Sequence, residues 1–151
     1  MRSIKGFTLI ELVLVIAILG VLAVAALPNL FSVSLTAART NAMNATVGAI
    51  QTGVTLYGAN QLAAGSALSY PATLDSVTGT SGGVAATNAA RLFTSVTQNG
   101  ISAQWFKLAA TGSTAFTYAY DTDGSAAYTS AGDTCFVYTV ATGTFVSTTC
   151  P

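Results

Sequence analysis

Three aspartates near the end of the chain form an acidic cluster. Asp121 and Asp123 stand in the run Asp121-Thr122-Asp123-Gly124-Ser125, and Asp133 follows ten residues after Asp123. This Asp-x-Asp-Gly run suggests hard-cation chemistry, because Ca²⁺ takes carboxylate and carbonyl oxygens as ligands. The twelve-residue calcium-loop pattern would end in a glutamate, which is missing here. Since Asp and Gly are also favoured in hairpin turns, the cluster has two interpretations: a turn, and alternatively a calcium site.

Other residues that could support catalysis or nucleic-acid binding are scarce. The chain of 151 residues has no histidine, and its five basic residues balance its five acidic ones. The lack of histidine removes the commonest general base and the commonest transition-metal ligand. No nucleophile–base constellation is present, so we expect neither an enzyme nor a cofactor. The absence of a basic stripe also argues against nucleic-acid binding.

The N-terminal stretch is apolar over the length of a membrane. Phe7–Leu27 as a helix reaches about 30 Å, the thickness of one bilayer core. Arg2 and Lys5 precede the run, which predicts a cytoplasmic N-terminus. A cleavable secretory signal, with Ala23-Val24-Ala25 as its cleavage site, is one alternative, and a plain membrane anchor is another. Glu11 disfavours the signal, because a charge weakens insertion, and it has no purpose in a plain anchor.

The stretch Gly6-Phe7-Thr8-Leu9-Ile10-Glu11 resembles the class III signal of type IV prepilins and pseudopilins. The run through Ala26-Leu27-Pro28 follows the same family pattern. The resemblance implies that a prepilin peptidase cuts between Gly6 and Phe7 on the cytoplasmic face, and that Phe7 is then N-methylated. It covers the first thirty or so residues and leaves the subtype of the remaining chain open.

The resemblance also gives Glu11 a role in assembly. Cleavage exposes an α-amine on Phe7, which is cationic at neutral pH if its pKa stays near 8. The resemblance implies that Glu11 meets the Phe7 amine of a neighbouring subunit in a filament. A paired charge in an apolar environment costs much less than an isolated one. We therefore expect Glu11 to set the position at which each subunit is added.

A helical pattern continues beyond Pro28, a residue that kinks or breaks helices. Apolar residues then recur at intervals of four and three, which is the period of one helix face. These residues are Met43, Val47, Ile50, Val54 and Tyr57. The pattern predicts one helix from about Phe7 to Tyr57, kinked at Pro28. Its second half is amphipathic and should lie on a globular domain.

The rest of the chain predicts a loop, a short helix and then strands. Residues 58–83 are rich in Ala, Gly, Ser and Thr, and Thr87–Gln98 has the cap and stop signals of a helix. β-Branched and aromatic residues in alternation then predict strands, in which Phe116, Tyr118 and Tyr120 share one face. The predicted strands are Ile101–Leu108, Ala115–Asp121, Thr134–Val140 and Thr144–Thr149. The expected fold is α+β, the type IV pilin fold: a long N-terminal helix packed on an antiparallel sheet of three or four strands.

The two cysteines, Cys135 and Cys150, lie in the last seventeen residues. If Thr142-Gly143 centres a hairpin, the two cysteines lie directly opposite each other. Opposed Cα atoms are about 4.5–5.5 Å apart, within the range that a disulfide needs. An even number of cysteines in an exported chain also favours a disulfide, and the alternative is a reduced, unlinked pair. The family often has a C-terminal loop closed by a disulfide.

These observations predict three segments: a cleaved leader (residues 1–6), a transmembrane and assembly helix (7–28), and a globular domain (29–151) that includes the amphipathic half-helix (29–57). We expect a structural subunit of a type IV pilus that serves adhesion or motility. The alternative is a pseudopilin of a type II secretion system, which a calcium site at Asp121 and Asp123 would favour.

The expected partners are further copies of the chain in a helical filament, the prepilin peptidase and methylase, and the pilus assembly platform. The subunit should lie in the inner membrane, crossing it once, before assembly. After assembly it should lie in an extracellular pilus on the cell surface.

Overall fold

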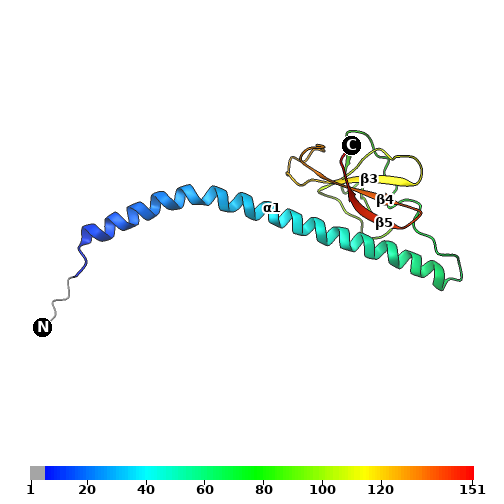
Figure 1. Cartoon of the computed structure of the whole chain (residues 1–151), viewed down its shortest axis with the longest axis horizontal. Helices are drawn as coiled ribbons and strands as arrows, with labels where there is room; N and C mark the ends of the chain where they lie inside the picture. Colours follow the sequence, from blue (N-terminus) through cyan, green and yellow to red (C-terminus); the bar gives the residue numbers. More distant parts are fainter. Residues whose placement is uncertain (1–5) are drawn as a thin grey trace. The chain divides into compact units, whose positions relative to one another are not determined.

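The computed structural model describes residues 6–151, except for the side chains of residues 25–34. The chain divides into two compact units, residues 1–38 and residues 39–151. In the described residues, one helix is followed by five strands. Figure 1 shows the long helix and labels the last three strands. This α+β layout is the predicted fold class.

Helix α1 (Leu9–Ala63) has 55 residues. The chain leaves the helix at Gly65, whose φ of 77° lies in the left-handed region, and the N–H of Ser66 closes the helix end on the carbonyl of Gln61 at 3.0 Å. The helix therefore extends six residues beyond the predicted end at Tyr57. Gly58 does not stop it, because this residue is buried in the helix with Tyr70 packed close to its Cα. The predicted kink at Pro28 lies among the residues whose side chains are not described.

The sheet belongs to the second unit and has the order β1-β2-β3-β4-β5, with every neighbouring pair antiparallel. The strands are β1 (Val84–Ala85), β2 (Trp105–Lys107), β3 (Ala115–Tyr120), β4 (Thr134–Thr139) and β5 (Thr144–Thr148). The sequence predicts three or four strands, and β1 is the fifth. Its two residues are too few for alternation to be recognised, and only their pairing with Lys107 and Phe106 makes them a strand.

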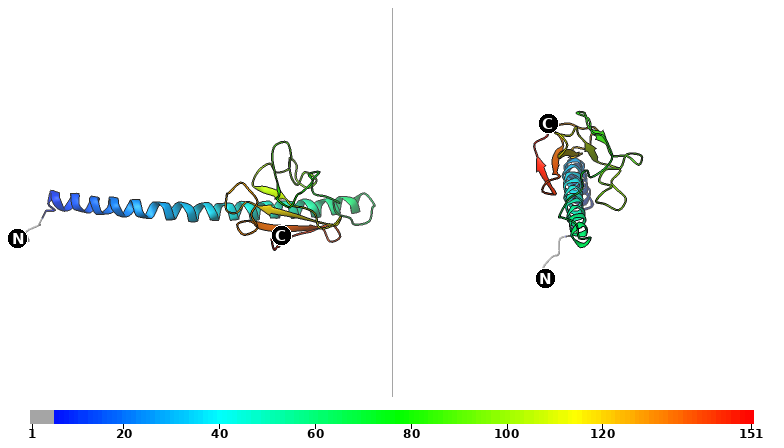
Figure 2. Two further views of the ribbon diagram at one scale, coloured as in Figure 1. Left: turned by 90° about the horizontal axis from the view of Figure 1, so that it is seen from above. Right: turned by 90° about the vertical axis from the view of Figure 1, so that its right-hand side faces the viewer.

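The main core lies between the C-terminal half of α1 and one face of the sheet (Figure 2). The predicted helix stripe is confirmed from Met43 to Val54: Met43, Ile50 and Val54 are buried, and Val47 packs against them. Tyr57, the last residue of the predicted stripe, is only half-buried. The predicted sheet face is confirmed as well, since Phe116, Tyr118 and Tyr120 all contact this core. Rings of Phe93, Trp105 and Phe145 meet in its centre, with Phe93 and Trp105 edge to face at 5.2 Å.

A smaller core covers the opposite face of the sheet. It contains Phe106, Leu108, Ala119 and Cys135, with Tyr128 packed against them. Because successive residues of a strand point to opposite faces, Trp105 enters the main core and Phe106 enters the smaller one.

The predicted short helix at Thr87–Gln98 is wrong. Leu92 pairs instead with Ile101 through two hydrogen bonds, of 2.9 and 2.8 Å, as an antiparallel bridge. Phe93 then adopts a φ of 60°, which a helix does not allow. The side chain of Phe93 is fully buried among other rings, so long-range packing outweighs the local helix signals.

Candidate functional site

The predicted processing site lies where the chain enters α1. Gly6 is exposed, and Phe7 is 86% exposed. The peptide bond between these two residues is therefore open to solvent in the single chain. The first five residues of the predicted leader lie outside the described residues.

Glu11 lies in the first turn of α1 and closes the N-terminus of the helix with Thr8. The N–H and the hydroxyl of Thr8 both donate to Oε2 of Glu11, at 2.9 and 2.8 Å. The N–H of Glu11 donates in turn to the carbonyl of Thr8 at 3.1 Å. The bond from the N–H of Thr8 to the side chain of Glu11 is one half of a capping box. The other half is absent, because the hydroxyl of Thr8 donates to the same carboxylate instead of accepting the N–H of Glu11. The arrangement orients the carboxylate from within its own chain.

The first unit presents apolar side chains on all sides. Large hydrophobic residues between Phe7 and Val24 are each about half exposed or more in the single chain. They are Phe7, Leu9, Ile10, Leu12, Val13, Leu14, Val15, Ile16, Ile18, Leu19, Val21, Leu22 and Val24. A helix that is apolar all round is normally buried in lipid or among other helices. This segment consequently needs a surrounding that a single copy of the chain does not supply.

Among the residues that the structure describes, no helix combines the length and the apolar character needed to cross a membrane. The predicted assembly residue Pro28 lies within the helical run, and nothing of its side chain is described.

Cys135 and Cys150 form a disulfide bond, with their Cα atoms 5.2 Å apart. The predicted register, however, is wrong by two residues. Cys135 pairs with Thr148 in the β4–β5 hairpin, and Cys150 lies just beyond the end of β5. A four-residue turn, residues 140–143, replaces the predicted two-residue turn at Thr142-Gly143. The N–H of Gly143 closes this turn on the carbonyl of Thr139 at 2.9 Å, and Gly143 takes a φ of 63°.

The three aspartates of the acidic cluster come together. Carboxylate oxygens of Asp121, Asp123 and Asp133 all lie within 4.8 Å of one another. Each carboxylate also accepts backbone N–H groups of its own loop, as when Gly124 donates to Asp121 at 2.6 Å and Thr129 to Asp133 at 2.8 Å. These hydrogen bonds agree with the turn interpretation. The three converging carboxylate oxygens are also of the kind that can act as ligands of a cation.

The cluster separates the pKa values of its members. Burial raises the pKa of Asp133, with the neighbouring carboxylates adding to the effect, although hydrogen bonds from Thr129 and Thr122 oppose it. The pKa of Asp123 is lowered, mainly by the hydrogen bond from the N–H of Ser125. Asp123 therefore keeps its negative charge to lower pH than Asp133 does.

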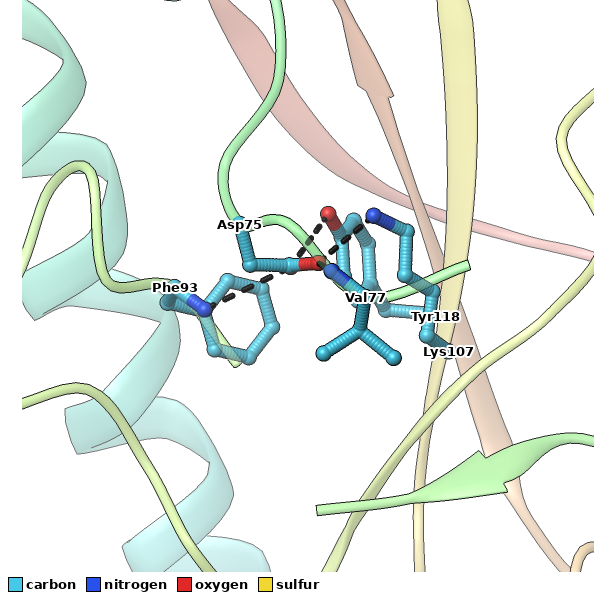
Figure 3. A network of polar contacts seen from close by, with 5 residues as sticks. All are labelled: Asp75, Val77, Phe93, Lys107 and Tyr118. Carbon is cyan, nitrogen blue, oxygen red and sulfur yellow. Dashed lines mark hydrogen bonds and ion pairs between the residues drawn. The ribbon is translucent and has the colours of Figure 1, made fainter. Parts of the chain in front are cut away.

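Sequence reasoning missed a buried polar network on the α1 side of the sheet (Figure 3). Nζ of Lys107 on β2 lies 2.6 Å from Oδ1 of Asp75, and the hydroxyl of Tyr118 on β3 donates to Oδ2 of Asp75 at 2.9 Å. Asp75 stands in a segment that reads as a polar loop, and Lys107 is an isolated charge in a strand. No local signal joins two residues 32 positions apart.

Comparison with known proteins gives one family model, described as the prokaryotic N-terminal methylation motif, which matches residues 1–27. Neither the curated proteins nor the solved structures yielded a significant match to the chain. The matched residues contain Gly6, Phe7 and Glu11, which the sequence singles out, together with the exposed apolar segment. Residues 1–27 thus carry the prepilin N-terminal methylation motif, the class III signal found in type IV pilins and pseudopilins.

Proposed function

We propose that this protein is a structural subunit of a type IV pilus, cut after Gly6, N-methylated on Phe7 and polymerised through its N-terminal helix. The methylation motif itself implies processing by a prepilin peptidase, membrane insertion and assembly into a pilus-like filament. The observation that carries the proposal is that this motif contains a segment, residues 7–24, whose exposed side chains are almost all apolar.

In this proposal residues 1–6 are the leader and residues 7–28 are the segment that leaves the inner membrane to form the filament core. Residues 29–151 form the globular part that faces outward. Such a subunit contacts the peptidase and methylase, the assembly platform and then further copies of itself. Its task is structural rather than catalytic, and adhesion or motility are the functions of the surface filament.

Glu11 is the residue proposed to direct assembly. Both bonds from Thr8 end on Oε2. Oε1 can therefore accept the methylated Phe7 amine of a neighbouring subunit while the cap stays intact. The pair neutralises both charges when the subunit enters the apolar filament core, where an unpaired charge is costly.

Glu11→Ala tests this role. The variant should insert and be processed as the wild type is, but sheared filaments should be lost. Leu12→Ala, a truncation of the neighbouring apolar residue, is the matched control and should assemble. Mass spectrometry of the mature chain reads out processing and methylation, and the yield of sheared fibres reads out assembly. Normal filaments from Glu11→Ala would refute the proposed role of the carboxylate.

The alternative function is that of a pseudopilin, which builds a short periplasmic filament in type II secretion. The convergence of Asp121, Asp123 and Asp133 favours it, if the cluster binds calcium. Calorimetric titration with Ca²⁺, with Asp123→Ala as the control, tests the site. The location of the mature chain separates the two functions, because a pilin is recovered from shed fibres and a pseudopilin from the cell envelope.

A further inference from the structure

The pair of Asp75 and Lys107 places an amine against a carboxyl group, with both side chains almost fully buried. Nζ and Oδ1 are 2.6 Å apart, and the side chains of Lys107 and Asp75 are 4% and 0% exposed. Rings surround the amine: its Nζ lies 5.2 Å from the ring centre of Phe116 and 5.6 Å from that of Tyr118. A buried ion pair in such surroundings bears a large desolvation cost.

The two oxygens of Asp75 have different partners. Oδ1 faces the amine and also accepts the N–H of Val77 at 3.0 Å. Oδ2 points away from the amine and accepts the hydroxyl of Tyr118 at 2.9 Å, with the N–H of Phe93 at 3.5 Å. Figure 3 shows these groups converging on the carboxylate from β2, β3 and two loops.

The different partners of Oδ1 and Oδ2 suit an attack by Nζ of Lys107 on Cγ of Asp75. The oxygen that gains charge during attack needs hydrogen-bond donors already in place, and Oδ2 has them. The oxygen that leaves should lie next to the proton source, and Oδ1 contacts the ammonium group. Burial and the charge of Asp75 raise the pKa of Tyr118, so its hydroxyl stays protonated and able to donate.

We propose that Lys107 and Asp75 condense into an intramolecular amide bond once the domain has folded. A proton first passes from Nζ to Oδ1, which leaves a neutral amine and a carboxylic acid. Nζ then forms a bond to Cγ, the bond from Cγ to Oδ1 breaks, and Oδ1 departs as water with a second proton from the nitrogen. Oδ2 becomes the amide oxygen and Tyr118 keeps its own proton, so atoms and charges balance without a further reactant.

Loss of both charges is the driving force of this step. In water the separate ions are well solvated and do not condense, whereas in a dry site their solvation is already lost. The product joins the loop after α1 to strand β2, and the released water has solvent close by, since an open cavity of about 350 Å³ borders both residues. The link would add a second covalent closure to the disulfide between Cys135 and Cys150. The proposed amide bond does not depend on whether the protein is a pilin or a pseudopilin.

Mass spectrometry of the full mature chain tests the amide directly. The linked chain is one water lighter than the processed, disulfide-bonded chain. Trypsin gives a second readout, because the basic residues after the leader are Arg39, Arg91 and Lys107 alone. An unlinked chain yields the pieces 40–91, 92–107 and 108–151. A linked chain yields 40–91 joined to 92–151, since trypsin does not cut after an amidated lysine.

Three variants distinguish a failure to form the amide bond from a failure to fold. Lys107→Arg keeps the charge but should give full mass and complete cleavage after position 107. Tyr118→Phe keeps the ring and loses one donor to Oδ2, so linking should slow by roughly 100-fold, as for the loss of one oxyanion-hole donor. Tyr128→Phe, which removes a hydroxyl bonded to the carbonyl of Pro151, is the matched control and should link at the wild-type rate.

Circular dichroism shows which variants are folded, and their masses are compared at equal times after folding. Full mass and ready cleavage after Lys107 in the folded wild-type chain would overturn the proposal. Equal linking rates for Tyr118→Phe and the wild type would overturn the role of the tyrosine.

Discussion

The carboxylate of Glu11 and both polar groups of Thr8 form a closed cap at the start of α1, with contacts of 2.8 and 2.9 Å to a single carboxylate oxygen. Cleavage after Gly6 leaves the Phe7–Thr8 peptide bond in place, so the mature chain retains this cap. The carboxylate is thereby oriented within its own chain before any neighbouring subunit arrives.

Thr8→Val removes the hydroxyl but keeps the backbone N–H that bonds Glu11. We expect the carboxylate of Glu11 to be less firmly oriented, because one of its two hydrogen bonds to Thr8 is lost. Processing should be unchanged, and the yield of sheared filaments should fall less than in Glu11→Ala. Filament loss as complete as in Glu11→Ala would show that the hydroxyl has a function beyond orienting the carboxylate.

Replacement of both Cys135 and Cys150 by serine should lower the free energy of unfolding by about 3 kcal/mol, the value expected for a closed loop of this length. The bond joins residues 15 positions apart and ties the end of the chain to β4. Urea denaturation of the wild type with and without reductant, compared with the double variant, measures the effect. A midpoint that reductant does not move would contradict the prediction.

Two glycines in α1 offer a matched pair of substitutions. A Cβ at Gly48 would meet nothing within 4 Å, whereas a Cβ at Gly53 would overlap the carbonyl oxygen of Val96. Gly48→Ala should therefore stabilise the chain by about 0.5–1 kcal/mol through helix propensity. Gly53→Ala should destabilise it by roughly 1–3 kcal/mol, because the loop at Val96 must move. Thermal unfolding of both variants measures the difference, and equal melting temperatures would contradict this packing.

The buried tyrosines predict a loss of stability in alkali. Burial raises the pKa of Tyr138 from 10.0 to about 12 in the folded chain, with Tyr57 and Tyr70 contributing. Between these two values the unfolded chain binds fewer protons than the folded one, so the free energy of unfolding falls as pH rises. Tyr118, whose pKa is also raised, adds to the same trend.

Tyr138→Phe should flatten this dependence above pH 10, since one of the titrating groups is gone. At neutral pH the variant should be less stable by about 1 kcal/mol, because the hydroxyl donates to the carbonyl of Pro71 in the wild type. Urea unfolding measured from pH 8 to pH 12 provides both values. A slope as steep as that of the wild type would exclude Tyr138 as a source of the effect.

Local patterns predicted the long helix and the longer strands, but neither the two-residue strand β1 nor the register of the last hairpin. The stripe from Met43 to Val54 is recognisable because helical periodicity is a property of neighbouring residues. The β4–β5 register was not recognisable in this way, because the turn length decides it and Gly143 can close a four-residue turn as readily as a two-residue one. The predicted helix at Thr87–Gln98 had good local signals, but it does not form because the burial of Phe93 requires another backbone conformation.

The sequence by itself determined the N-terminal motif, the long helix with its buried stripe, the α+β class and the pairing of the two cysteines. The motif, the helix and the fold class depend on residue types at short, regular spacing. The cysteine pairing follows because the chain has two cysteines. Only the tertiary structure decided the fifth strand, the hairpin register and the meeting of Asp75 with Lys107 and Tyr118. These depend on contacts that the folded chain makes outside any short regular pattern, for which no spacing rule exists.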